Sequence, residues 1–257
     1  MTFLKNRRSN MKILILNPNT TDAITQRMCA IASSLYPDRC FQGATGRFGA
    51  RYISSRTASA IAAHAALDAY AEQGQTADAV LLACFGDPGL FALREIAKVP
   101  VVGLAEAACA NAHARYGRFA IVTGGERWVP MLWEFLDLIG LKAQCAGIRC
   151  LTKTGGQIAE DPVGAHAELL GACETAFCSD GAEAVILAGA GLAGLADTLT
   201  PSLPKPVLCS VKMGIDAVVA ASERPFHKPN SGSFALPPAV ETLGLGSALT
   251  KLCERRD

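Results

Sequence analysis

Cys84 is the residue of this chain whose type and surroundings best suit chemistry. It follows the apolar run AVLLA and precedes the segment FGDPG, which predicts a position at the end of a buried strand. Gly86 and Gly89 let backbone N–H groups approach an anion, and a helix beginning near Pro88 would point its positive end there. The same field would lower the pKa of the thiol. Such a thiol could remove a proton next to a carbonyl while the amides hold the enolate; the alternative is an inert, buried cysteine.

Two further polar positions could join Cys84. Cys209 ends another apolar run and could supply an acid, with a buried spectator as the alternative. Asn17 ends the first apolar run and could donate a hydrogen bond to a substrate, whereas Thr20 and Thr21 suit a helix cap. For Cys84, Cys209 and Asn17 to act on one substrate, the strands that they end must all finish at the same cleft.

An internal repeat indicates two related halves. The stretch ADAVLLACFGDPGL (77–90) recurs as AEAVILAGAGLAGL (182–195), and each copy is followed by a matching segment, 99–107 and 205–213. A period of about a hundred residues is too long for a solenoid and indicates two α/β units. Ligands bind where the strands of open parallel sheets end, so the repeated loops are predicted to face each other across a cleft.

The second copy has a glycine where the first has the thiol. Gly189 mirrors Cys84, and GAGLAG (189–194) matches the dinucleotide fingerprint, with Asp216 about twenty residues further on. Asp216 is expected in a helix rather than at a strand end, and the repeat accounts for the glycines without a nucleotide. We therefore expect no cofactor.

The apolar pattern predicts an α/β fold with parallel sheets. Short strand-like runs alternate with longer Ala-rich helical stretches, as in βαβ units. We place residues 11–110 and 205–257 in the first half, residues 111–204 in the second, and treat residues 1–10 as a disordered extension. Residues 222–257 are expected to form an irregular excursion before a short helix, packed on a partner subunit of a homo-oligomer. The predicted strands are Lys12–Leu16, Ala79–Ala83, Val99–Leu104, Phe119–Thr123, Ala184–Ala188 and Pro206–Cys209.

Composition narrows the range of partners. The formal net charge is +1, which disfavours nucleic acid or an anionic membrane and favours a small molecule. No apolar run could span a bilayer and no signal peptide is evident, so a cytoplasmic location is expected. The ten cysteines suit reduced thiols, the pairs Cys145/Cys150 and Cys173/Cys178 fit no common zinc pattern, and the four histidines are dispersed. No metal site and no Ser–His–Asp triad is expected.

The sequence resembles the aspartate/glutamate/hydantoin racemase superfamily, and most of all its hydantoin and allantoin racemases. The resemblance spans about residues 11–221 through LNPNTT, ACFGDPGL, PVVGLAEAA, FAIVTGG and VILAGAGLAG. It implies two Rossmann-like halves related by pseudo-twofold symmetry, an active site in the cleft between them, and no cofactor. It also implies one catalytic cysteine at Cys84 and a second in the other half, where this chain has Gly189.

The resemblance also implies a pocket that holds a carboxylate or carbonyl largely through backbone amides. Tyr52 falls near a family binding position that has a different residue type, so the pocket is expected to differ. With Asn17 from its strand end and Gly189 from the repeat, the substrate-binding residues are expected to be Asn17, Tyr52, Phe85, Gly86, Thr123, Gly124, Gly189, Ala190 and Gly191.

Three hypotheses follow. The first is a racemase or isomerase of a hydantoin or amino-acid derivative, in which Cys84 removes the proton and Cys209, water or Cys84 itself returns it. The second is a lyase or decarboxylase of a malonate-like acid, in which Cys84 protonates a carbanion from one side; arylmalonate decarboxylases also have one cysteine, in the other half. The third is a lapsed protein that binds a small molecule without turnover.

Overall fold

The computed structural model describes residues 11–255, so the predicted extension 1–10 lies outside the described residues. Two four-stranded parallel sheets form the frame, with strand orders β2-β1-β3-β4 and β6-β5-β7-β8. In each sheet the strands lie in the order second, first, third and fourth along the chain, which confirms the prediction of two similar α/β halves. The strands are β1 Lys12–Asn17, β2 Cys40–Thr45, β3 Ala79–Leu82, β4 Val101–Gly103, β5 Phe119–Gly124, β6 Cys145–Leu151, β7 Ala184–Leu187 and β8 Val207–Cys209.

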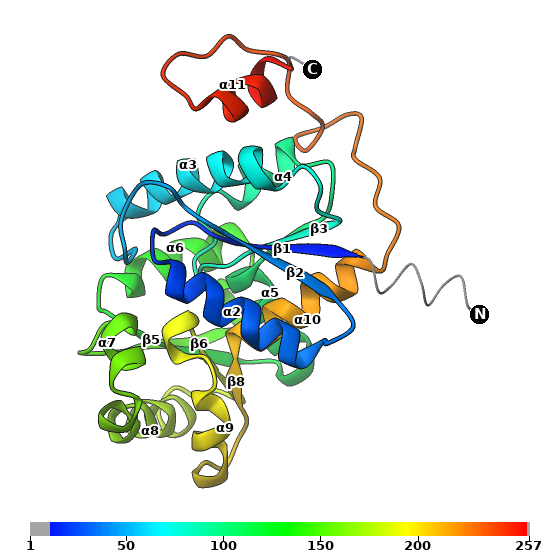
Figure 1. Cartoon of the computed structure of the whole chain (residues 1–257). Coiled ribbons are helices and arrows are strands. Elements are labelled where there is room, and N and C mark those ends of the chain that lie inside the picture. Colours follow the sequence, from blue (N-terminus) through cyan, green and yellow to red (C-terminus); the bar gives the residue numbers. More distant parts are fainter. Residues whose placement is uncertain (1–10, 256–257) are drawn as a thin grey trace.

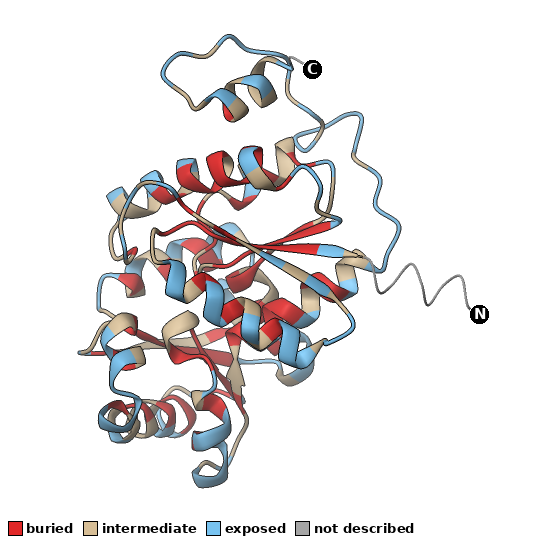
Figure 2. Ribbon diagram, in the orientation of Figure 1, coloured by how far each residue is buried: buried red, intermediate tan, exposed pale blue. Residues whose placement is uncertain are grey.

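The helices form layers outside and between the two sheets (Figure 1). Helices α3 and α4 cover the outer face of the first sheet, and α8 and α9 that of the second. Figure 2 shows the buried faces turned toward the sheets. The helices are α2 Asp22–Leu35, α3 Arg56–Gln73, α4 Leu90–Ile96, α5 Leu104–Tyr116, α6 Trp128–Leu138, α7 Gly155–Glu160, α8 Pro162–Cys178, α9 Leu195–Leu199, α10 Ser210–Ser222 and α11 Ser247–Glu254.

A shared core joins the halves. Apolar side chains of α5 and α10 pack with Ile13 and Leu81 of the first sheet and with Ile121 and Ile186 of the second. A Cβ on Gly214 of α10 would lie 2.5 Å from a methyl carbon of the Leu104 side chain. Helices α5 and α10 therefore pack closely at this glycine, between the two sheets.

The chain crosses between the halves twice, through α5 and α10. The predicted second crossing at residue 205 is five residues too early, because β8 still pairs with β7 of the second sheet. The return begins with α10 at Ser210, which packs on α5 and β3. Cys209 is therefore the last residue of the second sheet.

The C-terminal segment follows the predicted order of an irregular stretch and then a helix. After α10 the chain runs without regular elements to α11 (Figure 1). Helix α11 buries Leu249 and packs against α3 of the same chain, a contact within the chain where the sequence suggested a partner subunit. Within residues 11–255, no helix has the length and apolar character needed to cross a membrane.

Candidate active site

A cavity of about 330 Å³ lies between the two halves, at the carboxyl ends of the strands. The turn after β1, helix α2 and the loop after β3 line one wall. Strand β5, helices α6 and α7 and the loop after β7 line the other. Two repeated loops that the sequence predicted to oppose each other therefore share one cavity. Of the predicted site residues, seven line it: Tyr52, Cys84, Phe85, Thr123, Gly189, Ala190 and Gly191.

Cys84 is the second residue after β3 and lies on the first wall of this cavity. Burial raises the pKa of its thiol above the ordinary range, and the nearby Asp87 carboxylate raises it further. The sequence predicted a lowered pKa from the following helix; burial gives the opposite direction, and that helix, α4, has only seven residues. The thiol is the resting form of Cys84.

Asp87 fixes the loop that carries Cys84. Its carboxylate is 4% exposed and accepts hydrogen bonds from the backbone N–H groups of Ala105 (3.0 Å) and Glu106 (2.8 Å) in the first turn of α5. Burial raises the pKa of Asp87 to about 7, and these amide bonds oppose the shift. Sequence reasoning missed this role, because the residues that Asp87 contacts lie beyond the next strand.

The second wall is glycine-rich where it faces Cys84's loop. A Cβ on Gly189 would meet nothing within 4 Å, although its φ of +100° strains any other residue. The Gly189 N–H donates to the hydroxyl of Ser210 at 3.2 Å, so this amide already has a partner. A Cβ on Gly191 would lie 2.0 Å from the Gly155 carbonyl oxygen, which makes glycine necessary there.

Tyr52 joins the halves at the cavity. Its hydroxyl donates to the carbonyl of Gly124 (3.2 Å) and accepts from the N–H of Gly155 (3.2 Å). Burial raises the pKa of Tyr52, which keeps the hydroxyl protonated and able to donate. A residue of the first half thus holds the end of β5 and the start of α7 in the second.

Replacing Tyr52 by phenylalanine is expected to lower the free energy of unfolding by about 1–3 kcal/mol, because the variant leaves the buried N–H of Gly155 without a partner. Thermal unfolding would show this as a decrease in Tm of several degrees. Tyr116→Phe is the matched control, since that ring lies outside the cavity lining and beside the Arg115 guanidinium. An equal Tm change in both variants would contradict the bridging role.

Asn17 does not face the cavity. It is fully buried, and its side-chain amide donates to Asn19 Oδ1 (2.9 Å), Thr25 Oγ1 (3.0 Å) and the Thr21 carbonyl (3.3 Å). The predicted contact of Asn17 with substrate is therefore replaced by a structural role, and the neighbouring Asn19 lines the cavity instead.

Three other predicted residues also lie outside the lining of this cavity. Gly86 packs against Trp128, where a Cβ would lie 2.6 Å from a ring carbon, and Gly124 packs against the chain at Gly155. Cys209 contributes to the cores on both sides of the second sheet. The structure thus brings Cys84 to the cavity without a second cysteine beside it among the described lining residues.

Two charged residues at the cavity were not foreseen. Arg27 of α2 and Glu160 of α7 line it from opposite halves, and one guanidinium nitrogen of Arg27 donates to the Ala193 carbonyl at 2.8 Å. Both are exposed in helices, and exposed helix charges in a sequence give no signal of a site.

The cysteine pairs and the dinucleotide-like motif belong to ordinary structural elements. Cys145 and Cys150 lie in β6, and Cys173 and Cys178 in α8. Within residues 11–255, no three His, Cys, Asp or Glu side chains gather as metal ligands would. Asp216 lies in α10 as predicted, and its carboxylate accepts a hydrogen bond from Tyr36.

Comparison with known proteins gives a consistent result. The family model for Asp/Glu/hydantoin racemase matches residues 13–218. The hydantoin racemase of Rhizobium meliloti is 30% identical over 231 residues, which covers 88% of this chain and 95% of that protein. The allantoin racemase structure from Pseudomonas fluorescens has a TM-score of 0.87 and 30% identity, covering 91% of this chain and 100% of that chain. The Klebsiella pneumoniae allantoin racemase has a TM-score of 0.86 and 31% identity, covering 94% and 99%.

Proposed function

Because the chain belongs to the Asp/Glu/hydantoin racemase family, we propose that it is a hydantoin racemase-like enzyme without a cofactor. Its reaction would move the proton on the carbon next to the carbonyl of a hydantoin or a related amino-acid derivative. The observation that carries this proposal is Cys84 on the wall of a cavity between two similar halves.

Cys84 would act as the base and the acid. Its thiol stays protonated in the free protein because burial raises its pKa, so the reactive thiolate is a minor form. A hydantoin is a suitable substrate for an enzyme with little thiolate, because the adjacent carbonyl makes its C5 proton acidic and the carbonyl oxygen carries the charge of the enolate. Thr123, also in the cavity lining, has a hydroxyl that can donate to that oxygen.

Racemisation also requires a proton donor on the opposite face of the substrate, and Gly189 has no side chain that could provide one. Gly189 and Ala190 lie on the wall that comes from the other half and carry no acidic side chain. Two groups could supply that proton. One is water admitted beside Gly189, where a Cβ would meet nothing within 4 Å. The other is Cys84 itself, after the substrate rotates in the cavity to present its other face.

Arg27 and Glu160 favour a substrate whose C5 substituent is polar and dipolar. They line the cavity from opposite halves, and the guanidinium is a donor while the carboxylate is an acceptor. The ureido group of allantoin carries a carbonyl oxygen and N–H donors, so it can satisfy both. An alkyl substituent can satisfy neither, and we therefore propose allantoin-like ureido hydantoins as the preferred substrates.

Arg27→Gln is expected to raise the KM for allantoin about five- to tenfold, because a charge-assisted hydrogen bond is lost at a solvent-accessible position. The KM for 5-isopropylhydantoin should change less than about twofold. Steady-state kinetics on both substrates checks this. Equal changes for the two substrates would show a general disturbance of α2, whose Arg27 also holds the Ala193 carbonyl.

The proposed reaction is tested by incubating single enantiomers of allantoin and 5-isopropylhydantoin in D2O. NMR measures deuterium at the α-carbon, and polarimetry measures configuration, each against the spontaneous reaction without protein. Deuterium gain together with loss of optical rotation supports a racemase. Absence of catalysed exchange on every hydantoin would overturn the proposal.

The second candidate is a lyase or decarboxylase of a malonate-like acid, and Gly189 is the observation that favours it. A carbanion formed by loss of CO2 needs only one proton, which Cys84 could deliver from its own wall. This candidate predicts a single product enantiomer from a prochiral malonate, measured by chiral chromatography. Racemic product from the malonate would count against it.

A further inference from the structure

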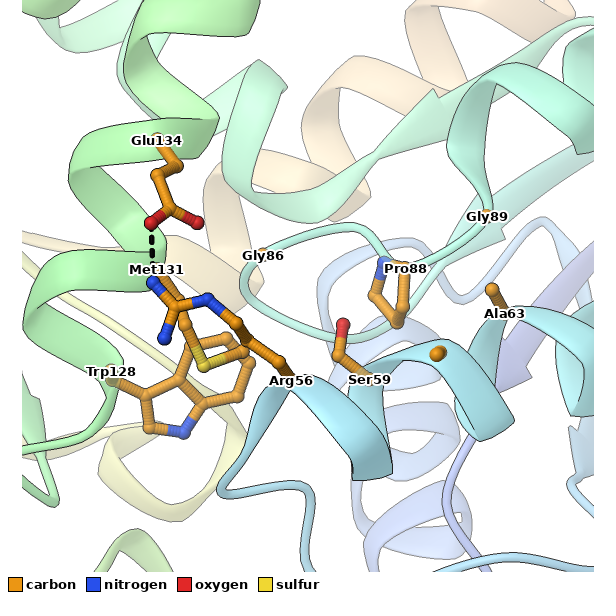
Figure 3. Close-up of a pocket in the computed structure, with 10 residues that line it drawn as sticks. Arg56, Ser59, Ala63, Gly86, Pro88, Gly89, Trp128, Met131 and Glu134 are labelled. Carbon is orange, nitrogen blue, oxygen red and sulfur yellow. Dashed lines mark hydrogen bonds and ion pairs between the residues drawn. The ribbon is translucent and has the colours of Figure 1, made fainter.

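A second cavity, the α3–α6 cavity, is bordered by the loop that carries Cys84. Its volume is about 340 Å³, and it is lined by α3 of the first half, α6 of the second and the loop residues Gly86, Pro88 and Gly89 (Figure 3). Cys84 and Phe85 face the first cavity, whereas Trp128 borders both. The same loop therefore forms a wall of each cavity.

The α3–α6 cavity combines an apolar interior with a charged edge. Its apolar surface comes from Ala63, Pro88, Trp128 and Met131 among others. At the edge, the guanidinium of Arg56 pairs with the carboxylate of Glu134, which joins α3 to α6 (Figure 3). The two side chains are 61% and 63% exposed, so solvent can replace either partner at little cost.

The charge at this edge suits an anionic ligand. Arg56 lies in the first turn of α3, and neither α3 nor α6 has an acidic residue in its first turn. Glu134 is thus the carboxylate that pairs with Arg56. Its exposure allows it to turn into solvent and leave the guanidinium to a carboxylate from outside, which can bind both guanidinium nitrogens where Glu134 binds one.

We propose that the α3–α6 cavity is a regulatory site for a small carboxylic acid with an aromatic or branched alkyl body. The carboxylate takes the place of Glu134 at Arg56, and the body packs on Trp128 and Met131. The contact between Trp128 and Gly86 leaves no room for a Cβ, so a ligand that presses on the indole also restrains the loop. Occupancy would slow the access of reagents to Cys84.

Phenylacetate is a suitable probe of binding. The chain has two tryptophans, and Trp133→Phe leaves Trp128 as the only fluorophore of its kind. We expect saturable quenching of Trp128, with a dissociation constant at least tenfold higher in Arg56→Gln and several-fold lower in Glu134→Gln, which removes the internal competitor. Both variants change exposed side chains, so both should fold.

The opposite responses of the two variants make the test decisive. Quenching that is absent, or that is unchanged in Arg56→Gln, would overturn the proposal, because the probe would then bind elsewhere, including the first cavity. The loop effect is measured by iodoacetamide labelling of Cys84 at pH 8.5, followed by peptide mass spectrometry. We expect at least threefold slower labelling with phenylacetate, less so in Arg56→Gln; an unchanged rate would overturn the coupling. Neither readout requires enzymatic turnover.

Discussion

Cys84→Ser is expected to slow α-proton exchange by roughly 10²–10⁴-fold, the usual contribution of a general acid or base. The hydroxyl has nearly the shape of the thiol but is a far weaker acid, so the fold should remain while proton transfer is lost. Exchange in D2O measures the rate, and circular dichroism with Tm verifies the fold. Cys209→Ser is the matched control, because Cys209 packs between the cores and does not line the cavity.

The expected rate ratio separates the two cysteines. Cys209→Ser should keep the exchange rate within about twofold of the wild type, since it only alters packing at a partly buried site. Comparable losses in both variants would mean that Cys209 also takes part in proton transfer. Exchange that survives in Cys84→Ser would contradict a role of Cys84 in proton transfer, and only the assignment of the fold and family would remain.

The raised pKa of Cys84 predicts the direction of the pH profile. Below that pKa the thiolate fraction grows about tenfold with each pH unit, so exchange should accelerate as the pH rises from about 6 to about 9. The Asp87 carboxyl, with a pKa of about 7, gains charge over the same range and raises the pKa of the Cys84 thiol further. The observed slope should therefore be shallower than tenfold per unit.

The sequence predicted the inner strands of both sheets well because they are continuous apolar runs buried on both faces. The strand AVLL of β3 and its repeat AVIL of β7 are fully buried. The strands β2 and β6 were missed because their residues are mostly partly exposed, and their sequences CFQGAT and CAGIRCL contain no continuous apolar run. The other two edge strands, β4 and β8, are short apolar runs and were predicted, so the apolar run rather than the position in the sheet decides the signal.

The site was predictable where one local segment determines it and unpredictable where the fold brings distant residues together. The segment ACFGDPGL contains both the strand end and the loop, so Cys84 could be placed from its neighbours alone. Arg27 and Glu160 lie 133 residues apart in the sequence, and only the packing of α2 and α7 around the cavity brings both to its lining. The Asn17 side chain does not reach the cavity, because the turn after β1 directs its amide inward to Thr25, and Asn19 lines the cavity in its place.

Gly189→Cys is expected to raise the racemisation rate at least tenfold over Gly189→Ala, because it adds a thiol to the wall that faces Cys84 across the substrate. A Cβ at this position meets no atom within 4 Å, so the side chain has room. The backbone is the obstacle, since Gly189 has φ +100° and ψ 157°, a region that costs other residues about 1–3 kcal/mol. A decrease in Tm of roughly 2–10 °C should accompany the substitution.

Gly189→Ala separates the thiol from the strain, because it imposes the same backbone cost without an acidic group. If racemisation increases equally in both variants, backbone movement rather than a second acid is responsible. If it increases only with cysteine, the two walls act as opposite faces of one proton-transfer site, and Gly189 is the reason that the natural chain relies on a single thiol. If neither variant racemises faster while Cys84-dependent exchange persists, the reacting carbon lies out of reach of residue 189, and the proton must return by another route from the wall of Cys84.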